Sequence, residues 1–305
     1  MSAPVRIGTR GSRLALWQAN EVARLLHEVG CTTEIVALRT TGDRRTDVAL
    51  AAIGGKGLFI KELEEALVSG RIDVAVHSLK DVPSLLPDEF ELGAFLERAD
   101  ARDAWVRAAG GTIGELPEGS VVGTSSPRRA AQVLARWPGL RVEPLRGNVE
   151  TRLAKQRDGQ YDGIVLASAG LGRLGLAASA TSLFDLDEIV PAAGQGIVTV
   201  EILRERDDLR ALLRRINHEP SEEAALAERG VLQKFGTRLD CYSPIAVHAT
   251  IHDGEIEIRA FLSDLEGRDA IRVHERGEAR AVVRAVHEQL VARGGLDLLA
   301  RASRG

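Results

Sequence analysis

The chain places arginines where an anionic ligand could be held. Only five of its 40 Lys and Arg residues are lysine. Several arginines follow apolar runs typical of strands: Arg10, Arg128, Arg129, Arg146 and Arg173, with Arg152 about one turn into the next expected helix. Strand carboxyl ends lie beside helix N-termini, which favour anions, and a guanidinium group binds a carboxylate through two hydrogen bonds. A GC-rich genome would also enrich arginine, but it would not select these positions. The placement predicts a ligand with several carboxylates or phosphates, bound between two α/β domains.

A second polar segment, His77-Ser78-Leu79-Lys80-Asp81-Val82-Pro83, follows the apolar run at residues 72–76. In open α/β sheets, ligands bind at the carboxyl ends of the strands. The serine, histidine and aspartate are too close in sequence to form a catalytic triad easily. The alternative is a polar turn that Pro83 closes, and the segment alone does not decide between turn and site.

The two cysteines, Cys31 and Cys241, are too few and too far apart for a disulfide framework or a zinc site, and we expect no metal. We interpret Cys31 as a small structural residue. Cys241 is a candidate nucleophile. In a cysteine hydrolase, His248 or His252 would be its base, but both alternate along an expected strand, and we expect them at the surface.

Two glycine-rich motifs are weak. Residues 170–175 match G-x-G-x-x-G, but no long helix pattern follows, which argues against nicotinamide binding. Residues 54–57 lack the Ser or Thr of a phosphate loop. We expect a mobile loop there.

Strands and helices have to position these side chains. We expect strands at residues 5–9, 33–38 and 72–76 and helices at 14–29 and 58–68, with Ser12 as the first N-cap. This βαβαβ order implies a mainly parallel sheet. After the turn signal at 117–119, strands at 121–123, 141–145 and 163–167 alternate with helices at 128–136 and 149–157. We therefore expect a second α/β domain in the style of the first.

The last third has an α+β pattern. We expect helices at 209–216, 221–235 (capped by Ser221) and 279–292, and strands at 246–251 and 255–261. Asp253-Gly254 joins these strands as a strong hairpin signal.

Length and composition agree with two or three domains in 305 residues. A net charge of −4 gives no indication of nucleic acid as a partner. No apolar run is long enough for a membrane span, and residues 1–10 do not resemble a signal peptide. We expect a cytoplasmic monomer.

Residues 5–18, VRIGTRGSRLALWQ, closely resemble the N-terminus of the porphobilinogen deaminase (hydroxymethylbilane synthase) family. Further resemblances follow in the family's order, at residues 54–59, 76–83, 122–129, 145–149 with Arg152, 169–175 and 191–196. The resemblance implies three domains: 1–96 with 197–215, 101–192, and 219–305. The first two would be α/β domains like those of periplasmic binding proteins, hinged over a cleft, and the third would be α+β.

The resemblance also implies an activity, a cofactor and a set of site residues. Four porphobilinogen molecules would be deaminated and joined into a linear tetrapyrrole on a dipyrromethane held by Cys241. Asp81 would be catalytic. The cofactor would also contact Lys80, Ser126, Arg128, Arg129 and Gly147, the substrate would contact Arg10, Ser12, Arg146, Arg152 and Arg173, and Lys56 and Phe59 would belong to the mobile loop. Leu239 and Asp240 stand where the family usually has two glycines, and the charge of Asp240 should disfavour the thiolate.

One further alternative is a solute-binding protein for polyanionic ligands. It would share the fold and the arginine placement but not a reactive cysteine. It would also need export, which the N-terminal residues do not indicate.

Overall fold

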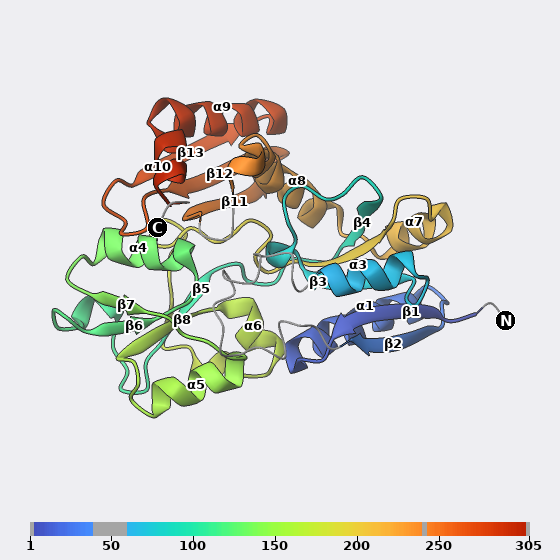
Figure 1. The fold of residues 1–305 in the computed structure, drawn as a ribbon, viewed down its shortest axis with the longest axis horizontal. Helices are drawn as coiled ribbons and strands as arrows, with labels where there is room; N and C mark the ends of the chain where they lie inside the picture. Colours follow the sequence, from blue (N-terminus) through green and yellow to red (C-terminus); the bar gives the residue numbers. More distant parts are fainter. Residues whose placement is uncertain (1–2, 39–59, 240–242, 303–305) are drawn as a thin grey trace. The chain divides into compact units, whose positions relative to one another are not determined.

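The protein is described here by a computed structural model that covers residues 3–38, 60–239 and 243–302. Its strands form three sheets (Figure 1). The chain divides into two compact units. The first comprises Met1–Ala99 and Gly196–Glu223, and the second comprises Asp100–Gln195 and Ala224–Gly305. The predicted division into three domains stays a prediction.

The first unit contains a five-stranded sheet. Its strands are β1 (Val5–Arg10), β2 (Thr33–Leu38), β3 (Val74–Ser78), β4 (Phe90–Phe95) and β10 (Val198–Leu203), in the order β2-β1-β3-β10-β4. β1 is parallel to β2 and β3, whereas β10 is antiparallel to both β3 and β4. Four strands therefore share one direction, and β10 runs against them.

Helices cover both faces of this sheet. On one face, α1 (Arg13–Glu28) and α7 (Asp207–Leu213, continued by a 3-10 turn at Arg214–Ile216) form a core with alternate residues of β3 and β10. On the other face, α3 (Lys61–Val68) contributes Leu63, Ala66 and Leu67 to a second core. Ser12 is the N-cap of α1, as predicted, because its side chain accepts the Ala15 N–H.

The second unit contains a five-stranded sheet with an equivalent strand order. Its strands are β5 (Asp103–Val106), β6 (Val121–Gly123), β7 (Arg141–Glu143), β8 (Gly163–Ala167) and β9 (Ser182–Leu183), in the order β7-β6-β8-β5-β9. Three parallel strands are again followed by an antiparallel one. α4 (Pro127–Arg136) packs on one face, and α5 (Val149–Arg157) with α6 (Ser168–Arg173) on the other.

The second unit also contains an antiparallel sheet of β11 (Ile245–His252), β12 (Glu255–Leu262) and β13 (Ile271–Gly277). Three helices pack against this sheet: α8 (Glu219–Gln233), α9 (Ala279–Ala292) and α10 (Gly295–Ala302). Their apolar residues form one core with it. The predicted hairpin is confirmed: Asp253 and Gly254 have φ values of 53° and 81°. Among the described residues, further 3-10 turns lie at Leu79–Asp81, Ile113–Glu115, Ala177–Ser179 and Gly236–Arg238.

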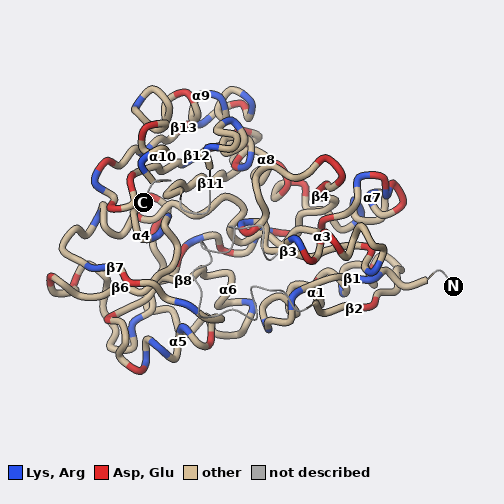
Figure 2. The backbone as a smooth tube through the Cα atoms, in the orientation of Figure 1, with Lys and Arg blue, Asp and Glu red and all other residues tan. Residues whose placement is uncertain are grey.

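The fold class is confirmed as α/β with a C-terminal α+β part. One predicted cap is wrong: α8 begins at Glu219, so Ser221 lies within its first turn. The Ser221 hydroxyl instead accepts the Arg98 N–H at 2.9 Å and lies 2.8 Å from His218 Nδ1. No helix in the described ranges has both the length and the apolar character needed to span a bilayer. Figure 2 shows basic and acidic residues interspersed along both units.

Candidate active site

In the first unit, the predicted residues gather at the carboxyl edge of the sheet. β1 and β3 are parallel neighbours in which Ile7 is opposite Val74, so the segments that follow them leave the sheet at the same edge. Arg10 is the last residue of β1, and Ser12 caps the helix that follows. Lys80 and Asp81 form the 3-10 turn directly after β3. A bond of 2.7 Å from Gln18 Nε2 to Ser78 Oγ ties α1 to this turn.

Asp81 is an exposed carboxylate at this edge. Within the described part of the chain, no side chain or backbone N–H donates a hydrogen bond to it and no cation pairs with it. A carboxylate in this state can accept hydrogen bonds from the N–H groups of a ligand. The structure therefore leaves the predicted catalytic group available for one.

Behind this turn lies a buried histidine–glutamate contact that the sequence did not indicate. His77 Nε2 lies 2.8 Å from Glu201 Oε2, and the two side chains are 6% and 0% exposed. Both residues point to the α3 face of the sheet, on neighbouring strands β3 and β10. Burial, and then the charge of Glu201, raise the pKa of Glu64 on α3. The pair forms a polar patch in the interior next to the Asp81 turn.

In the second unit, the predicted arginines also follow parallel strands. β6, β7 and β8 are parallel neighbours, so the segments after them share one edge. Ser126 caps α4 after β6, Arg146 follows β7, and Arg173 ends α6 after β8. Ser125 Oγ donates to the Leu145 carbonyl at 2.8 Å and ties the first two of these segments together.

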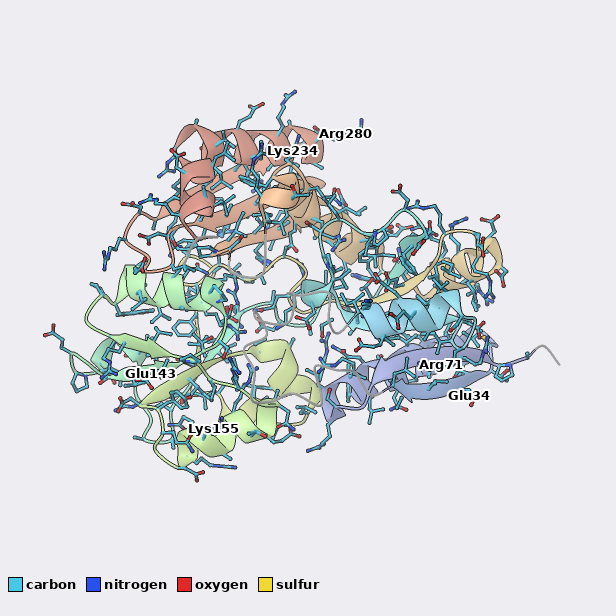
Figure 3. The ribbon with its side chains drawn as sticks, in the orientation of Figure 1. Glu34, Arg71, Glu143, Lys155, Lys234 and Arg280 are labelled. Atoms are coloured by element: carbon cyan, nitrogen blue, oxygen red, sulfur yellow. The ribbon has the colours of Figure 1, made fainter. Side chains whose placement is uncertain are left out.

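Side chains of α5 hold the segment that follows β7. Lys155, labelled on α5 in Figure 3, donates from Nζ to the Arg146 carbonyl at 3.2 Å. Arg152 Nε donates to the Gly147 carbonyl at 2.7 Å. Gly147 has φ +113°, and a Cβ there would lie 2.7 Å from Thr151 Cγ2. Glycine is therefore required at this position for backbone reasons, whatever contact it makes with a ligand.

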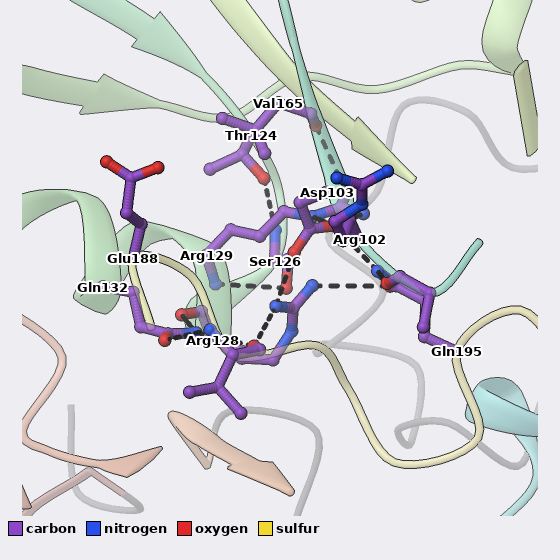
Figure 4. A network of polar contacts seen from close by, with 12 residues as sticks. Arg102, Asp103, Thr124, Ser126, Arg128, Arg129, Gln132, Val165, Glu188 and Gln195 are labelled. Carbon is purple, nitrogen blue, oxygen red and sulfur yellow. Dashed lines mark hydrogen bonds and ion pairs between the residues drawn. The ribbon is translucent and has the colours of Figure 1, made fainter. Parts of the chain in front are cut away.

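Arg128 and Arg129, at the start of α4, are only 5% and 6% exposed. Both donate to the carboxylate of Asp103 on β5, with shortest distances of 2.7 Å (Figure 4). Burial alone would raise the pKa of Asp103, but the charges of the two guanidinium groups outweigh burial and lower it. The predicted ligand arginines are thus held from inside the protein by a carboxylate that the sequence did not single out.

Three predicted site residues lie outside the described residues: Lys56, Phe59 and Cys241. On either side of Cys241, the structure describes the chain up to Leu239 and from Ser243, two residues before β11. Their predicted roles stay predictions.

The expectation of a surface position is wrong for His248. This side chain on β11 is 4% exposed, and its Nδ1 lies 3.3 Å from Oε1 of Glu228 on α8. Glu228 also accepts the N–H groups of Gly194 at 2.6 Å and Ala249 at 2.7 Å. The second face of the three-stranded sheet is covered within the unit, where Ala246 packs in a cluster with Ala131 of α4, and this buries His248. His252, at the end of the strand, is 52% exposed.

The buried polar residues that sequence reasoning missed share one signal. Asp103 directly precedes the apolar residues 104–106, and Glu201 interrupts the apolar run 198–203. A lone acid within an apolar strand needs a buried partner, because an unpaired buried charge is strongly unfavourable. The signal reveals that a partner exists but does not identify it.

Comparison with known proteins places these residues in a family. The family model described as "Porphobilinogen deaminase, dipyromethane cofactor binding domain" matches residues 5–211, and its C-terminal domain model matches 223–292. The chain belongs to the porphobilinogen deaminase family. Relatives named porphobilinogen deaminase include one from Bordetella parapertussis, 47% identical over 96% of this chain and 95% of its own. Another, from Chromobacterium violaceum, is 46% identical over 96% of each chain.

Similarity to solved structures is distant. The periplasmic VFT2 domain of Bordetella pertussis BvgS aligns with a TM-score of 0.44 and 15% identity over 70% of this chain and 86% of that one. A likeness at this level carries no argument about function.

The described residues fit the chemistry of the family's dipyrromethane cofactor, a group with pyrrole N–H donors and carboxylate side chains. The first unit supplies an exposed carboxylate, Asp81, which can accept hydrogen bonds from N–H groups. The second supplies Arg128 and Arg129, whose joint charge exceeds that of their partner Asp103. Each set suits one kind of polar group on such a molecule.

Proposed function

We propose that this protein deaminates four porphobilinogen molecules, joins them head to tail and, by addition of water, releases the linear tetrapyrrole hydroxymethylbilane, with loss of four molecules of ammonia. The observation that carries the proposal is the exposed Asp81 carboxylate after β3 in a chain that matches the family almost from end to end. We also propose that the protein acts in the cytoplasm as a monomer.

Asp81 would act on the pyrrole nitrogen. As ammonia leaves porphobilinogen, positive charge develops on the ring N–H, and the carboxylate would accept that N–H and stabilise the charge. A carboxylate about 4 Å from a cation contributes roughly 4 kcal/mol at an effective dielectric constant of 20. This corresponds to about three orders of magnitude in rate.

The arginines would act on the carboxylates. Each pyrrole carries an acetate and a propionate, so the growing chain accumulates negative charge. Arg10 in the first unit, and Arg146, Arg152 and Arg173 in the second, lie at the carboxyl edges where such groups would be bound. Ser12 would support them through the N-terminus of α1.

Arg128 and Arg129 would hold a carboxylate of the cofactor, with Ser126, Gly147 and Lys80 as further contacts. When bound through the Cys241 sulfur, dipyrromethane supplies the nucleophilic pyrrole carbon from which the chain grows. Attachment requires some thiolate at Cys241. The charge of Asp240 opposes it, but attachment is needed only once per molecule.

Intact-mass measurement of the purified protein tests the proposal. We expect an adduct of two linked pyrroles that is lost in Cys241→Ser. Cys31→Ser is the matched control and should keep the adduct, because Cys31 packs beside the core of the first unit. When both proteins are expressed without the two-pyrrole adduct and then incubated with porphobilinogen, Asp240→Gly should acquire the adduct faster than the wild type.

A protein that stays unmodified after incubation with porphobilinogen or with preformed hydroxymethylbilane would contradict the proposal. So would an adduct that persists in Cys241→Ser. Binding of porphobilinogen without ammonia release would favour a non-catalytic binding protein instead.

A further inference from the structure

Asp103 is the most fully enclosed carboxylate around the predicted arginines. Its side chain has no solvent exposure. Arg129 donates to Oδ1 from Nε at 3.0 Å and from Nη2 at 2.7 Å, and Arg128 Nη1 donates to Oδ2 at 2.7 Å. Gln195 Nε2 donates to Oδ1 at 2.9 Å. Four N–H groups from two separate segments thus converge on one carboxylate (Figure 4).

The same segments are also joined by hydrogen bonds between side chains and backbone groups. Arg128 Nη1 also donates to the Val190 carbonyl at 2.6 Å, and Gln132 Oε1 accepts the Val190 N–H at 2.7 Å. Arg129 Nη1 donates to the Val165 carbonyl at 3.2 Å. Gln195 Nε2 donates to the Ala101 carbonyl at 2.6 Å. Both guanidinium groups are therefore oriented by contacts to β5, β8 and the 190–195 segment.

The charges in this cluster do not balance. Two guanidinium groups share one carboxylate, and no second carboxylate among the described residues lies within ion-pair distance of either. Buried charges are unfavourable unless they are paired, and apolar residues often replace buried ion pairs without loss of stability. Arg128 and Arg129 are 5% and 6% exposed, so the one positive charge that Asp103 does not balance destabilises the folded protein. The same unbalanced charge would be neutralised by a bound anion.

We infer that Asp103 is a positioning residue that fixes the Arg128 and Arg129 guanidinium groups and cancels one of their two charges, so that the pair accepts one ligand carboxylate. The inference rests on the proposed function for the identity of that ligand. Asp103 itself does not contact the ligand. It acts by holding two side chains, which would otherwise repel each other, in one arrangement.

Two variants and one control test this role. Asp103→Asn removes the charge at nearly constant shape. Gln195→Ala changes no charge; it removes one donor to Asp103 and also the amide oxygen that accepts from Arg128 Nη2 at 3.5 Å. It remains a test if Asp103→Asn does not fold. Asp187→Asn is the control, because Asp187 is also paired with an arginine in this unit, Arg259 at 2.9 Å, but its side chain is 80% exposed.

The measurements are KM and kcat for porphobilinogen, the fraction carrying the adduct by intact mass, and the porphobilinogen-induced shift in melting temperature. All are made at a temperature where circular dichroism shows folded protein. We expect Gln195→Ala to raise KM about tenfold while kcat changes less than about twofold, from the loss of one hydrogen bond to a charged group. Asp103→Asn should lose most of the adduct and of the thermal shift, and Asp187→Asn should match the wild type.

The outcomes separate this inference from the proposed function. Variants with lower melting temperatures but wild-type KM, adduct fraction and thermal shift would overturn it, because the cluster would then be only structural. A wild type that shows a porphobilinogen-induced shift without turnover, with the shift lost in Gln195→Ala, would support it while contradicting the proposed activity.

Discussion

Two aspartates, one in each unit, show how the environment separates roles that residue type does not. Asp81 follows β3 at the edge of the first sheet, is exposed, and receives no hydrogen bond from any described residue. Asp103 begins β5 of the second sheet, is fully buried, and accepts hydrogen bonds from Arg128, Arg129 and Gln195. The Asp81 carboxylate can therefore accept hydrogen bonds from a ligand, whereas the Asp103 carboxylate accepts hydrogen bonds from other residues of the protein.

The two sheets, although alike in strand order, present different groups at their edges. The first presents the exposed Asp81 carboxylate, which can stabilise a cation, at the same edge as Arg10 and Lys80. The second presents positive groups fixed from behind by a buried negative one. Substitutions at these positions should therefore separate effects on turnover from effects on stability.

The largest effect should come from Asp81→Asn. The change keeps the shape but removes the charge that stabilises the pyrrole cation, so turnover should fall by about three orders of magnitude. The melting temperature should stay within about 1 °C of the wild type, because Asp81 is exposed and pairs with none of the described residues. Ammonia release measures turnover. A variant that keeps more than about a tenth of the wild-type rate leaves under 1.4 kcal/mol for the charge, and the catalytic assignment would be wrong.

Asp103→Asn should act on stability in a pH-dependent way. At pH 7 we expect the free energy of unfolding to fall by about 3 kcal/mol, because two buried guanidinium groups lose their counter-charge. The pKa of Asp103 is lowered in the folded protein, so its contribution is complete above the unfolded pKa of about 4. It is lost as the pH falls from there toward the lower folded pKa.

Thermal unfolding of the wild type and Asp103→Asn at pH 7, 4 and 3 measures this contribution. The gap between the two melting temperatures should narrow on acidification, while the gap between the wild type and Asp187→Asn should stay close to zero. A gap that is constant from pH 7 to pH 3 would mean that the carboxylate charge does not stabilise the cluster.

Arg146→Leu, in the second unit, should have an intermediate effect on activity. Loss of a charge-assisted hydrogen bond to a substrate carboxylate, worth about 2 kcal/mol, should lower kcat/KM about thirtyfold. Arg146→Lys should also lower kcat/KM, because an ammonium group cannot form the two parallel hydrogen bonds that a guanidinium group forms with a carboxylate. Arg141→Leu is the matched control, because Arg141 begins the same strand, β7, and is 65% exposed. Equal kinetics in the two leucine variants would remove Arg146 from the site.

The smallest effect should come from Ser12. Ser12→Ala removes the cap that accepts the Ala15 N–H at 3.3 Å and should cost about 1 kcal/mol of stability. Ser12→Asn should restore stability, because asparagine caps equally well. If Ser12→Asn also restores KM for porphobilinogen, the residue acts only through the helix. If KM stays raised, the hydroxyl contacts the ligand.

Local sequence determined those elements whose signals lie within a few residues. Ser12 and the apolar spacing after it specify α1 (Arg13–Glu28), and α5 (Val149–Arg157) and β8 (Gly163–Ala167) have their predicted bounds. Asp253-Gly254 specifies its hairpin because both residues readily take the positive φ that the turn requires. The arginines after strands are found in the same way, because the carboxyl end of a strand is readable from the chain alone.

The contacts of those side chains depend on segments that are distant in the sequence. β10 lies between β3 and β4, although more than a hundred residues separate it from both, and a short apolar run cannot reveal such a partner. Burial of His248 depends on packing over the second face of its sheet. Asp103 could not be recognised because its donors come from residues 128, 129 and 195. A carboxylate's role is set by the charges and the solvent around it, and distant segments supply both.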